Sequence, residues 1–188
     1  MTLTLDKLPT QLGVDGTVVA FQTEDGRIQV WDLQTNKVKV LDQIDAQMTN
    51  PRFSGFPGAV KVSGRTVAAL GGRDGSGFPT YVTLYDVDKG SSEVLTNRAF
   101  PAGLSFDGNH LVWSEITGRQ PSALAALIGR SVAETELVIY SLQSKTGSYA
   151  LKERGQQGFA SIGGDRLAWQ DSVRGGDDIY AATLPAGF

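Results

Sequence analysis

Hydrophobic and polar positions along this chain follow a phrase that occurs four times. A glycine is followed three residues later by a branched apolar residue, then a smaller one, then usually an aromatic. The copies occupy 16–21, 64–69, 108–113 and 164–169, and their glycines are 48, 44 and 56 residues apart. A period of about 40–50 residues built from short strands indicates a repeat architecture.

Each copy is embedded in a pattern of strands. Apolar residues two and four positions before each glycine alternate with polar ones, which predicts a strand with one buried face. The dipeptides ending in these glycines favour the positive φ of a tight hairpin. Third strands are predicted at 28–33, 82–87, 137–142 and 179–184, and fourth strands at 37–41, 92–95 and 148–151. Four antiparallel strands per repeat predict an all-β, four-bladed β-propeller.

The last repeat ends without room for a fourth strand. Residues 2–5 alternate correctly, so we expect this N-terminal strand to complete the last blade beside 179–184 and to close the ring. The chain is then one propeller domain, 1–188. Its blades are expected at about 10–43, 58–97, 102–153 and 158–184, with strand 2–6 added to the last.

One short helix is expected between the strands, at 121–133. Leu124, Leu127, Ile128 and Val132 form an apolar stripe at helical spacing, and Pro121 suits a first helical turn. The stripe either packs on neighbouring loops or is an exposed anchor for a partner or a second copy.

The chain resembles the TolB-type propeller repeat, related to WD40-like repeats. The resemblance rests on Ala168-Trp169-Gln170-Asp171 leading to Gly176-Asp177-Asp178-Ile179-Tyr180, and on the strand 28–33 followed by a polar turn. It extends over essentially the whole chain. It implies a bacterial binding platform or a domain appended to a peptidase.

Composition excludes several classes of function. The net charge of −3 is spread along the chain, which argues against nucleic-acid binding. No apolar run approaches the roughly 18 residues of a membrane span, and no signal peptide precedes the first repeat. With no cysteine, the chain has no disulfide and no thiol chemistry. The missing cysteines and the family resemblance together favour an extracytoplasmic, periplasmic or secreted, location.

Loop lengths point to one face of the propeller. The long segments 42–58, 71–80, 116–135 and 170–176 all belong to the same end of the blades, and long loops on a rigid scaffold often bind partners. The candidate binding residues on this face are Arg52, Phe53, Phe56, Arg73, Asp74, Phe78, Arg119, Leu124, Leu127, Ile128, Arg130, Asp171 and Arg174.

Acidic residues gather in the same loops: Asp171, Asp177 and Asp178, with Asp74 and Glu115. They could hold Ca²⁺, although no spacing matches a dedicated calcium loop, or act as paired glycosidase acids. The primary expectation is no cofactor, no metal and no catalytic residue. His110, the single histidine, lies next to a short turn on the opposite face and is interpreted as structural. Asp32 and Asp86 are interpreted as turn-capping residues.

These observations favour a non-enzymatic binding module, soluble and with a protein or peptide partner on the long-loop face. Two alternatives remain open at this point. One is a carbohydrate-active hydrolase using carboxylates on that face, and the other is a structural subunit of an appendage, particle or surface assembly. Self-association is a further option. Core positions are expected at Val19, Val30, Val67, Leu84, Leu111, Ile139 and Leu167.

Overall fold

The computed structural model describes residues 2–44, 59–72, 80–117, 134–150, 156–171 and 178–184. Within these ranges the chain forms antiparallel strands and no helix, which confirms the all-β class. Over the same ranges, no helix is long and apolar enough to cross a bilayer. The short helix expected at 121–133 lies outside the described residues.

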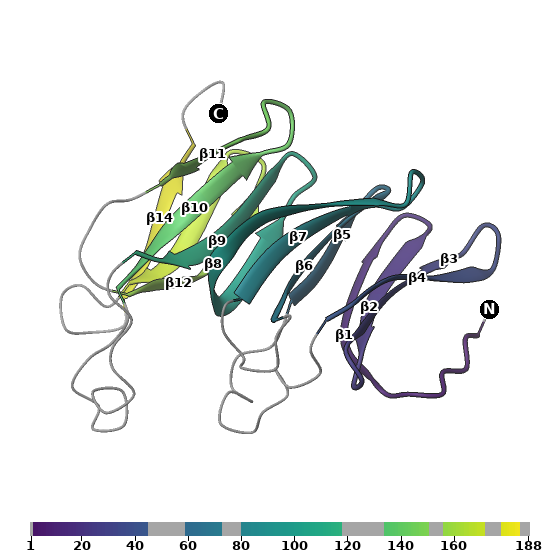
Figure 1. Cartoon of the computed structure of the whole chain (residues 1–188). Coiled ribbons are helices and arrows are strands. Elements are labelled where there is room, and N and C mark those ends of the chain that lie inside the picture. Colours follow the sequence, from purple (N-terminus) through teal and green to yellow (C-terminus); the bar gives the residue numbers. More distant parts are fainter. Residues whose placement is uncertain are drawn as a thin grey trace, which may run out of the picture. The chain divides into compact units, whose positions relative to one another are not determined.

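The chain divides into two compact units, Met1–Asn97 and Arg98–Phe188. The first unit opens with a four-stranded sheet of β1 (Pro9–Asp15), β2 (Val18–Thr23), β3 (Arg27–Asp32) and β4 (Lys37–Gln43), hydrogen-bonded in that order. It continues with β5 (Ala59–Ser63), β6 (Thr66–Gly72) and β7 (Thr80–Asp86). These elements are labelled in Figure 1.

Strand β8 (Ser91–Phe106) runs from the first unit into the second, so its hydrogen-bonded sheet reads β11-β10-β9-β8-β7-β6-β5. The second unit contributes β9 (His110–Ile116), β10 (Thr135–Ser141) and β11 (Thr146–Tyr149) to it. A three-stranded sheet follows, with β12 (Gln157–Gly163), β13 (Arg166–Asp171) and β14 (Asp178–Thr183) in sequence order. For clarity, β5–β7 with the start of β8 is called the second sheet, the end of β8 with β9–β11 the third sheet, and β12–β14 the last sheet.

The predicted hairpin turns are confirmed. The turn glycines Gly16, Gly64 and Gly164 have φ of 54°, 55° and 59°, a region that side chains with a Cβ rarely adopt. The predicted turn caps are confirmed as well. The Asp32 carboxylate accepts the backbone N–H groups of Gln34 and Thr35 at 2.9 and 3.0 Å, and Asp86 does the same for its own turn.

Asp32 also joins two sheets of the first unit. Its Oδ2 accepts a hydrogen bond from Arg65 Nη1 at 2.5 Å, and the same guanidinium contacts Asp88 at 2.7 Å. The Arg65 guanidinium, together with the backbone N–H of Thr35, lowers the pKa of Asp32 to about 2. The ion pair therefore persists in mildly acidic solution.

Each unit has its own apolar core between two packed sheets. In the first unit, Val18, Ala20 and Val30 of the first sheet face Val67 and Tyr85 of the second. In the second unit, the packed side chains come from the third and last sheets: Val112, Leu137, Ile139, Ile162, Leu167 and Trp169. Five predicted core residues are buried: Val30, Val67, Leu111, Ile139 and Leu167.

Two of the residues predicted to be in the core are less buried than expected. Val19 and Leu84 are only half-buried. Val19 was assigned from the repeated phrase and Leu84 from the predicted third strand 82–87, and neither pattern distinguishes the two faces of a strand. Val19 belongs to the face of the first sheet opposite the core of the first unit, because its neighbours Val18 and Ala20 supply that core.

The N-terminal strand expected to close the last sheet is also not found. Residues 2–5 belong to no strand, and the last sheet has three described strands. The segment that follows is held at the first sheet instead. The Leu8 carbonyl accepts the Glu24 N–H at 2.9 Å, and the Asp6 carboxylate pairs with Arg27 at 3.2 Å. These contacts direct the N-terminal segment toward the β2–β3 turn.

Candidate functional site

Of the thirteen candidate binding residues, Asp171 is the one that the structure describes. The others lie outside the described residues: Arg52, Phe53, Phe56, Arg73, Asp74, Phe78, Arg119, Leu124, Leu127, Ile128, Arg130 and Arg174. The same holds for Asp177 of the acidic group. The candidate site is therefore built around Asp171 in the second unit.

Asp171 ends β13 and lies in a polar row across the last sheet. Gln157 of β12 and Asp178 of β14 are its direct cross-strand partners. Gln157 is fully buried, Asp171 is 5% exposed and Asp178 is exposed. Like charges directly opposite one another weaken a sheet, so the Asp171–Asp178 pair does not contribute to stability.

Gln157 connects the last sheet to the third sheet. The Thr135 hydroxyl donates to the Gln157 carbonyl at 2.8 Å and accepts the Gln157 N–H at 2.9 Å. The side-chain oxygen of Gln157 accepts the Leu137 N–H at 3.3 Å. Three hydrogen bonds between packed sheets therefore hold this strand end in place.

Two buried donors at this end have no acceptor among the described contacts. They are the Gln157 side-chain amide Nε2 and the Trp169 indole Nε1. Trp169 lies two residues before Asp171 on the same face of β13, and its ring stacks on Tyr180 with centroids 5.7 Å apart. A buried donor without a partner costs roughly 1–3 kcal/mol, so such groups in a folded protein need an explanation.

Glu115 occupies the corresponding position in the third sheet but has a different environment. Its Oε1 accepts the Trp113 indole N–H at 3.2 Å, and its Oε2 accepts the Tyr149 hydroxyl at 3.1 Å. Burial, followed by the hydrogen bond to Glu115, raises the pKa of Tyr149. Glu115 is thus committed to contacts within its own sheet.

Glu115 and Asp171 do not form a pair of catalytic acids. Trp113 and Glu115 share one face of β9, whereas Val112 on the opposite face belongs to the same apolar core as Trp169 of the last sheet. The third sheet therefore separates the two carboxylates. In the described part of the chain, no group of three or more acidic or His side chains is placed to hold a metal ion.

His110 lies at the other end of β9, as the sequence predicted. Its backbone N–H donates to the Asp107 carboxylate at 2.8 Å, and Nδ1 lies 3.5 Å from the other carboxylate oxygen. The structure places it at the start of β9, next to the β8–β9 turn. A structural role for this histidine stays a prediction.

Gln157, Thr135 and Trp169 were not identified from the sequence as site residues. One signal was present, because Trp113-Ser114-Glu115 and Trp169-Gln170-Asp171 repeat the same Trp-x-acid pattern at the same distance from their glycines. Nothing in the sequence indicated Gln157 or Thr135, since their contact joins strands from different sheets.

Comparison with known proteins shows the fold. No protein-family model and no curated protein sequence matches the chain. The computationally designed Ika4 protein is similar over 97% of this chain and 94% of its own length, with a TM-score of 0.54 and 14% identity. TolB from Acinetobacter baumannii (TM-score 0.52, 13% identity) covers 91% of this chain. A putative TolB from Agrobacterium tumefaciens (TM-score 0.59, 11% identity) covers 95%.

The chain spans 39% and 59% of the lengths of these two TolB proteins. At such low identity the likeness shows the fold alone, and that fold is a TolB-like β-propeller fold.

Proposed function

We propose that the chain is a non-enzymatic propeller module with four blades, and that it binds a protein or peptide partner at the strand end that carries Gln157, Trp169 and Asp171. The observation that supports this most directly is the pair of buried donors without acceptors, Gln157 Nε2 and Trp169 Nε1. Both belong to the last sheet, where Gln157 is the cross-strand partner of Asp171 and Trp169 lies two residues before Asp171 on the same face of β13. The TolB-like fold supports a binding role in a general way.

A peptide suits these donors. Its backbone carbonyl oxygens are strong acceptors, and hydrogen bonds to them would remove the cost of the unpaired N–H groups. Asp171 adds a carboxylate at the same strand end, which suits a backbone N–H or a basic side chain of the peptide. An extracytoplasmic location stays a prediction.

Peptides selected from a random display library against the folded chain test this proposal. We expect Trp169→Phe to weaken the selected peptides by about 5–10-fold, as expected for one hydrogen bond, and to lower the melting temperature less than Trp113→Phe does, because no hydrogen bond within the protein is lost. Trp113→Phe is the matched control, because its indole already has Glu115 as acceptor. This variant should lose stability and keep its affinity.

Two results would contradict the proposal. One is equal affinity of the selected peptides for the native chain and for Trp169→Phe. The other is a library that gives no binder to the folded chain, with the same selection succeeding on an unrelated peptide-binding domain.

A further inference from the structure

The face of the first sheet that lies opposite the core of the first unit is apolar over most of its length, with the charged Arg27 at one end, where it pairs with Asp25 and Asp6. On the rest of this face, strand register places eight side chains, seven apolar and one amide: Leu12, Val14, Val19, Phe21, Gln29, Trp31, Val38 and Val40. Leu12 and Val14 of β1 are 64% and 63% exposed, and Val38 and Val40 of β4 are exposed as well, whereas Phe21 and Gln29 on the two central strands are buried. A sheet face that is exposed to water normally carries polar side chains. An apolar face such as this one is therefore suited to burial against another surface.

The repeat shows what such a face packs against. The row Val14–Val19–Trp31 corresponds to Val62–Val67–Tyr85 in the second sheet, counted from the glycine of each phrase. In the first unit, that second row is packed onto the first sheet.

The receiving row in the first sheet is made of small residues, Gly13, Ala20 and Val30. A Cβ added to Gly13 would lie 3.1 Å from the Val60 carbonyl, so the two sheets approach closely here.

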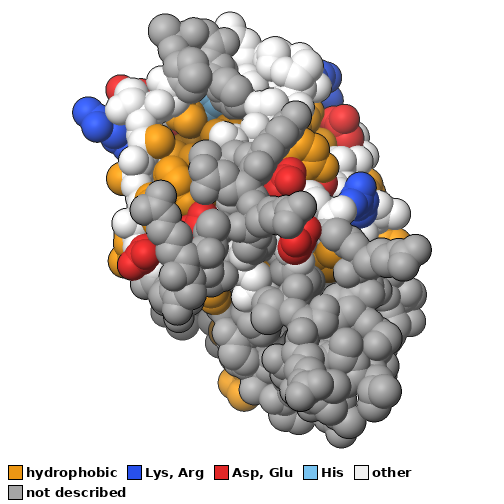
Figure 2. Space-filling view, turned by 90° about the vertical axis from the view of Figure 1, so that its left-hand side faces the viewer, with side chains coloured by type: hydrophobic (Ala, Val, Ile, Leu, Met, Phe, Trp, Pro, Cys, Tyr) orange, Lys and Arg blue, Asp and Glu red, His pale blue; other side chains and the backbone are white. Residues whose placement is uncertain are grey.

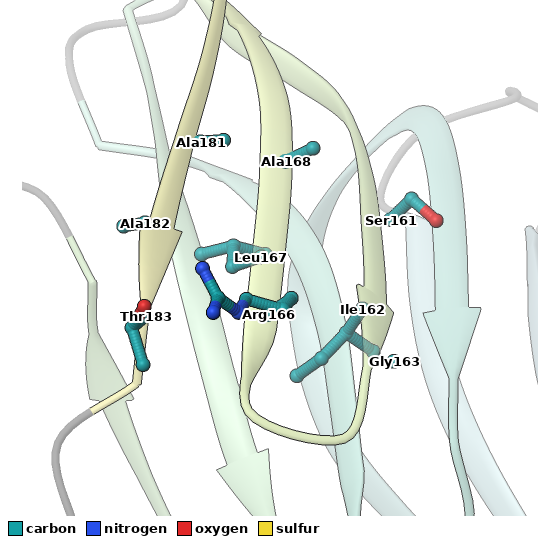
Figure 3. Close-up of a pocket in the computed structure, with 9 residues that line it drawn as sticks. All are labelled: Ser161, Ile162, Gly163, Arg166, Leu167, Ala168, Ala181, Ala182 and Thr183. Atoms are coloured by element: carbon teal, nitrogen blue, oxygen red, sulfur yellow. The ribbon is translucent and has the colours of Figure 1, made fainter.

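The last sheet has the same receiving row and leaves it open. Ser161, Ala168 and Ala181 correspond to Gly13, Ala20 and Val30. They line a hollow of about 550 Å³ together with Arg166 and Thr183 (Figure 3). The space-filling view of the left-hand side of Figure 1 shows hydrophobic side chains exposed on this face among uncharged, acidic and basic ones (Figure 2).

In the second unit, a hydrogen bond connects the two packed sheets at the equivalent junction. The Ile162 N–H of the last sheet donates to the Ser105 hydroxyl of the third sheet at 3.0 Å. By position in the repeat, Val14 corresponds to Ile162 and Ser161 corresponds to Ser105. The Val14 N–H of the first sheet therefore corresponds to the donor of this bond, and the Ser161 hydroxyl of the last sheet corresponds to its acceptor.

We propose that these faces join two copies of the chain, the first sheet of each copy packing on the last sheet of the other. The occupant is a second copy because the chain carries both halves of a junction that its interior already uses. Length permits two copies. The designed Ika8 protein is similar over 97% of this chain and 48% of its own length, with a TM-score of 0.56, whereas the designed Ika4 protein, similar over 94% of its own length, has the length of one copy.

Cysteine cross-linking tests the pairing, because the chain has no cysteine of its own. In a Val14→Cys, Ser161→Cys double variant, mild oxidation should give a covalent dimer of about 40 kDa, twice the 20.0 kDa of one chain. The dimer should revert to monomer on reduction. Ser105→Cys, Ile162→Cys is the control pair, which should link within one chain.

Three results would overturn the two-copy junction. A link within one chain for the Val14–Ser161 pair indicates that the chain closes on itself. A ladder of larger species indicates an open array. No link, with the control pair linked, indicates that these faces do not meet.

Charge substitution gives an independent measurement without cysteines. Val38→Glu places a carboxylate on the apolar face of the first sheet, and Val94→Glu places one at a similarly exposed valine, 46% against 41%, in the second sheet. By light scattering at low micromolar concentration, the native chain and Val94→Glu should have the dimer mass and Val38→Glu the monomer mass. A native chain of monomer mass, or two variants of equal mass, contradicts the proposal.

Discussion

The third and last sheets carry the same Trp-x-acid pattern at the end of one strand, but the two acids make different contacts. Trp113 and Glu115 in the third sheet, and Trp169 and Asp171 in the last, lie five and seven residues after the glycine of their phrase. All four side chains are buried. In the third sheet the acid accepts the indole N–H at 3.2 Å, whereas in the last sheet the indole has no acceptor among the described contacts.

Two physical differences separate these strand ends. The carboxylate of Asp171 is carried on one methylene fewer than that of Glu115, so it reaches less far along the strand toward the indole two residues before it. The third sheet also has a fourth strand, β11, whose Tyr149 fixes the second oxygen of Glu115 at 3.1 Å. The last sheet has three described strands and no such residue among them. The same repeated strand can thus end with its indole N–H bonded to the nearby acid, as in the third sheet, or without such a bond among the described contacts, as in the last sheet.

The largest effect on stability is expected in the third sheet, where Glu115 accepts the indole N–H. Glu115→Leu removes the acceptor of the buried Trp113 N–H and of the Tyr149 hydroxyl, and we expect the free energy of unfolding to fall by about 2–3 kcal/mol. Urea unfolding measures this loss. Glu93→Leu, at an exposed position of β8, is the control and should change stability by less than about 0.5 kcal/mol. A loss as small as the control would mean that the third-sheet contact is not a stabilising one.

Exchanging Glu115 and Asp171 should exchange which indole N–H is hydrogen-bonded to the nearby acid. Asp171→Glu adds the missing methylene, so the carboxylate can accept the Trp169 N–H, and we expect a gain of about 1 kcal/mol. Glu115→Asp should cost a similar amount by leaving the Trp113 N–H unpaired. Urea unfolding of both variants, with the indole N–H resonances followed by NMR, measures the exchange.

The same Asp171→Glu variant sharpens the functional proposal, because a Trp169 indole already bonded to the longer carboxylate should bind the selected peptides less well. If both acid variants destabilise the protein and the Trp169 resonance does not move, the length of the acidic side chain is not the cause of the difference.

The smallest effect concerns the titration of Tyr149. Burial and the hydrogen bond to Glu115 raise its pKa, so the protonated hydroxyl stabilises the fold below about pH 10 and this contribution is lost as pH rises through the folded-state pKa. Glu115→Gln removes the negative charge, and the pKa of Tyr149 should fall toward its usual range. Absorbance at about 295 nm follows this, with Tyr149→Phe identifying the transition among five tyrosines. An unchanged titration would leave burial as the sole cause.

Most of the strand order was readable from the sequence. The glycine of each phrase requires positive φ, and alternation on either side of it defines two strands, so the hairpins Pro9–Thr23 and Gln157–Asp171 followed from local chemistry. Asp32 and Asp86 were identified as turn caps for the same reason, since a short carboxylate beside a turn has few other partners. Such features depend on residues within a few positions of one another.

The candidate site depended on contacts that local patterns do not contain. Asp171 was expected in the loop 170–176 and is the last residue of β13. The Gln157–Thr135 bonds join residues 22 positions apart in different sheets. The burial of Val67 but not of Val19, at matching positions of the phrase, depends on which sheet faces each of them. A strand's sequence specifies that one face can be buried, and only packing decides which neighbour covers it.

The sequence by itself therefore determined the repeat, the hairpins, the turn caps and the apolar character of the sheet faces. Each of these is set by backbone conformation and alternation over a few residues. Tertiary structure decided which apolar faces are covered, that Trp113 has an acceptor while Trp169 has none among the described contacts, and that the N-terminal segment is held at the first sheet rather than in the last. These outcomes turn on differences of about one methylene, or of a fourth strand that the third sheet has and the described part of the last sheet does not, and such differences become visible only when distant segments are packed together.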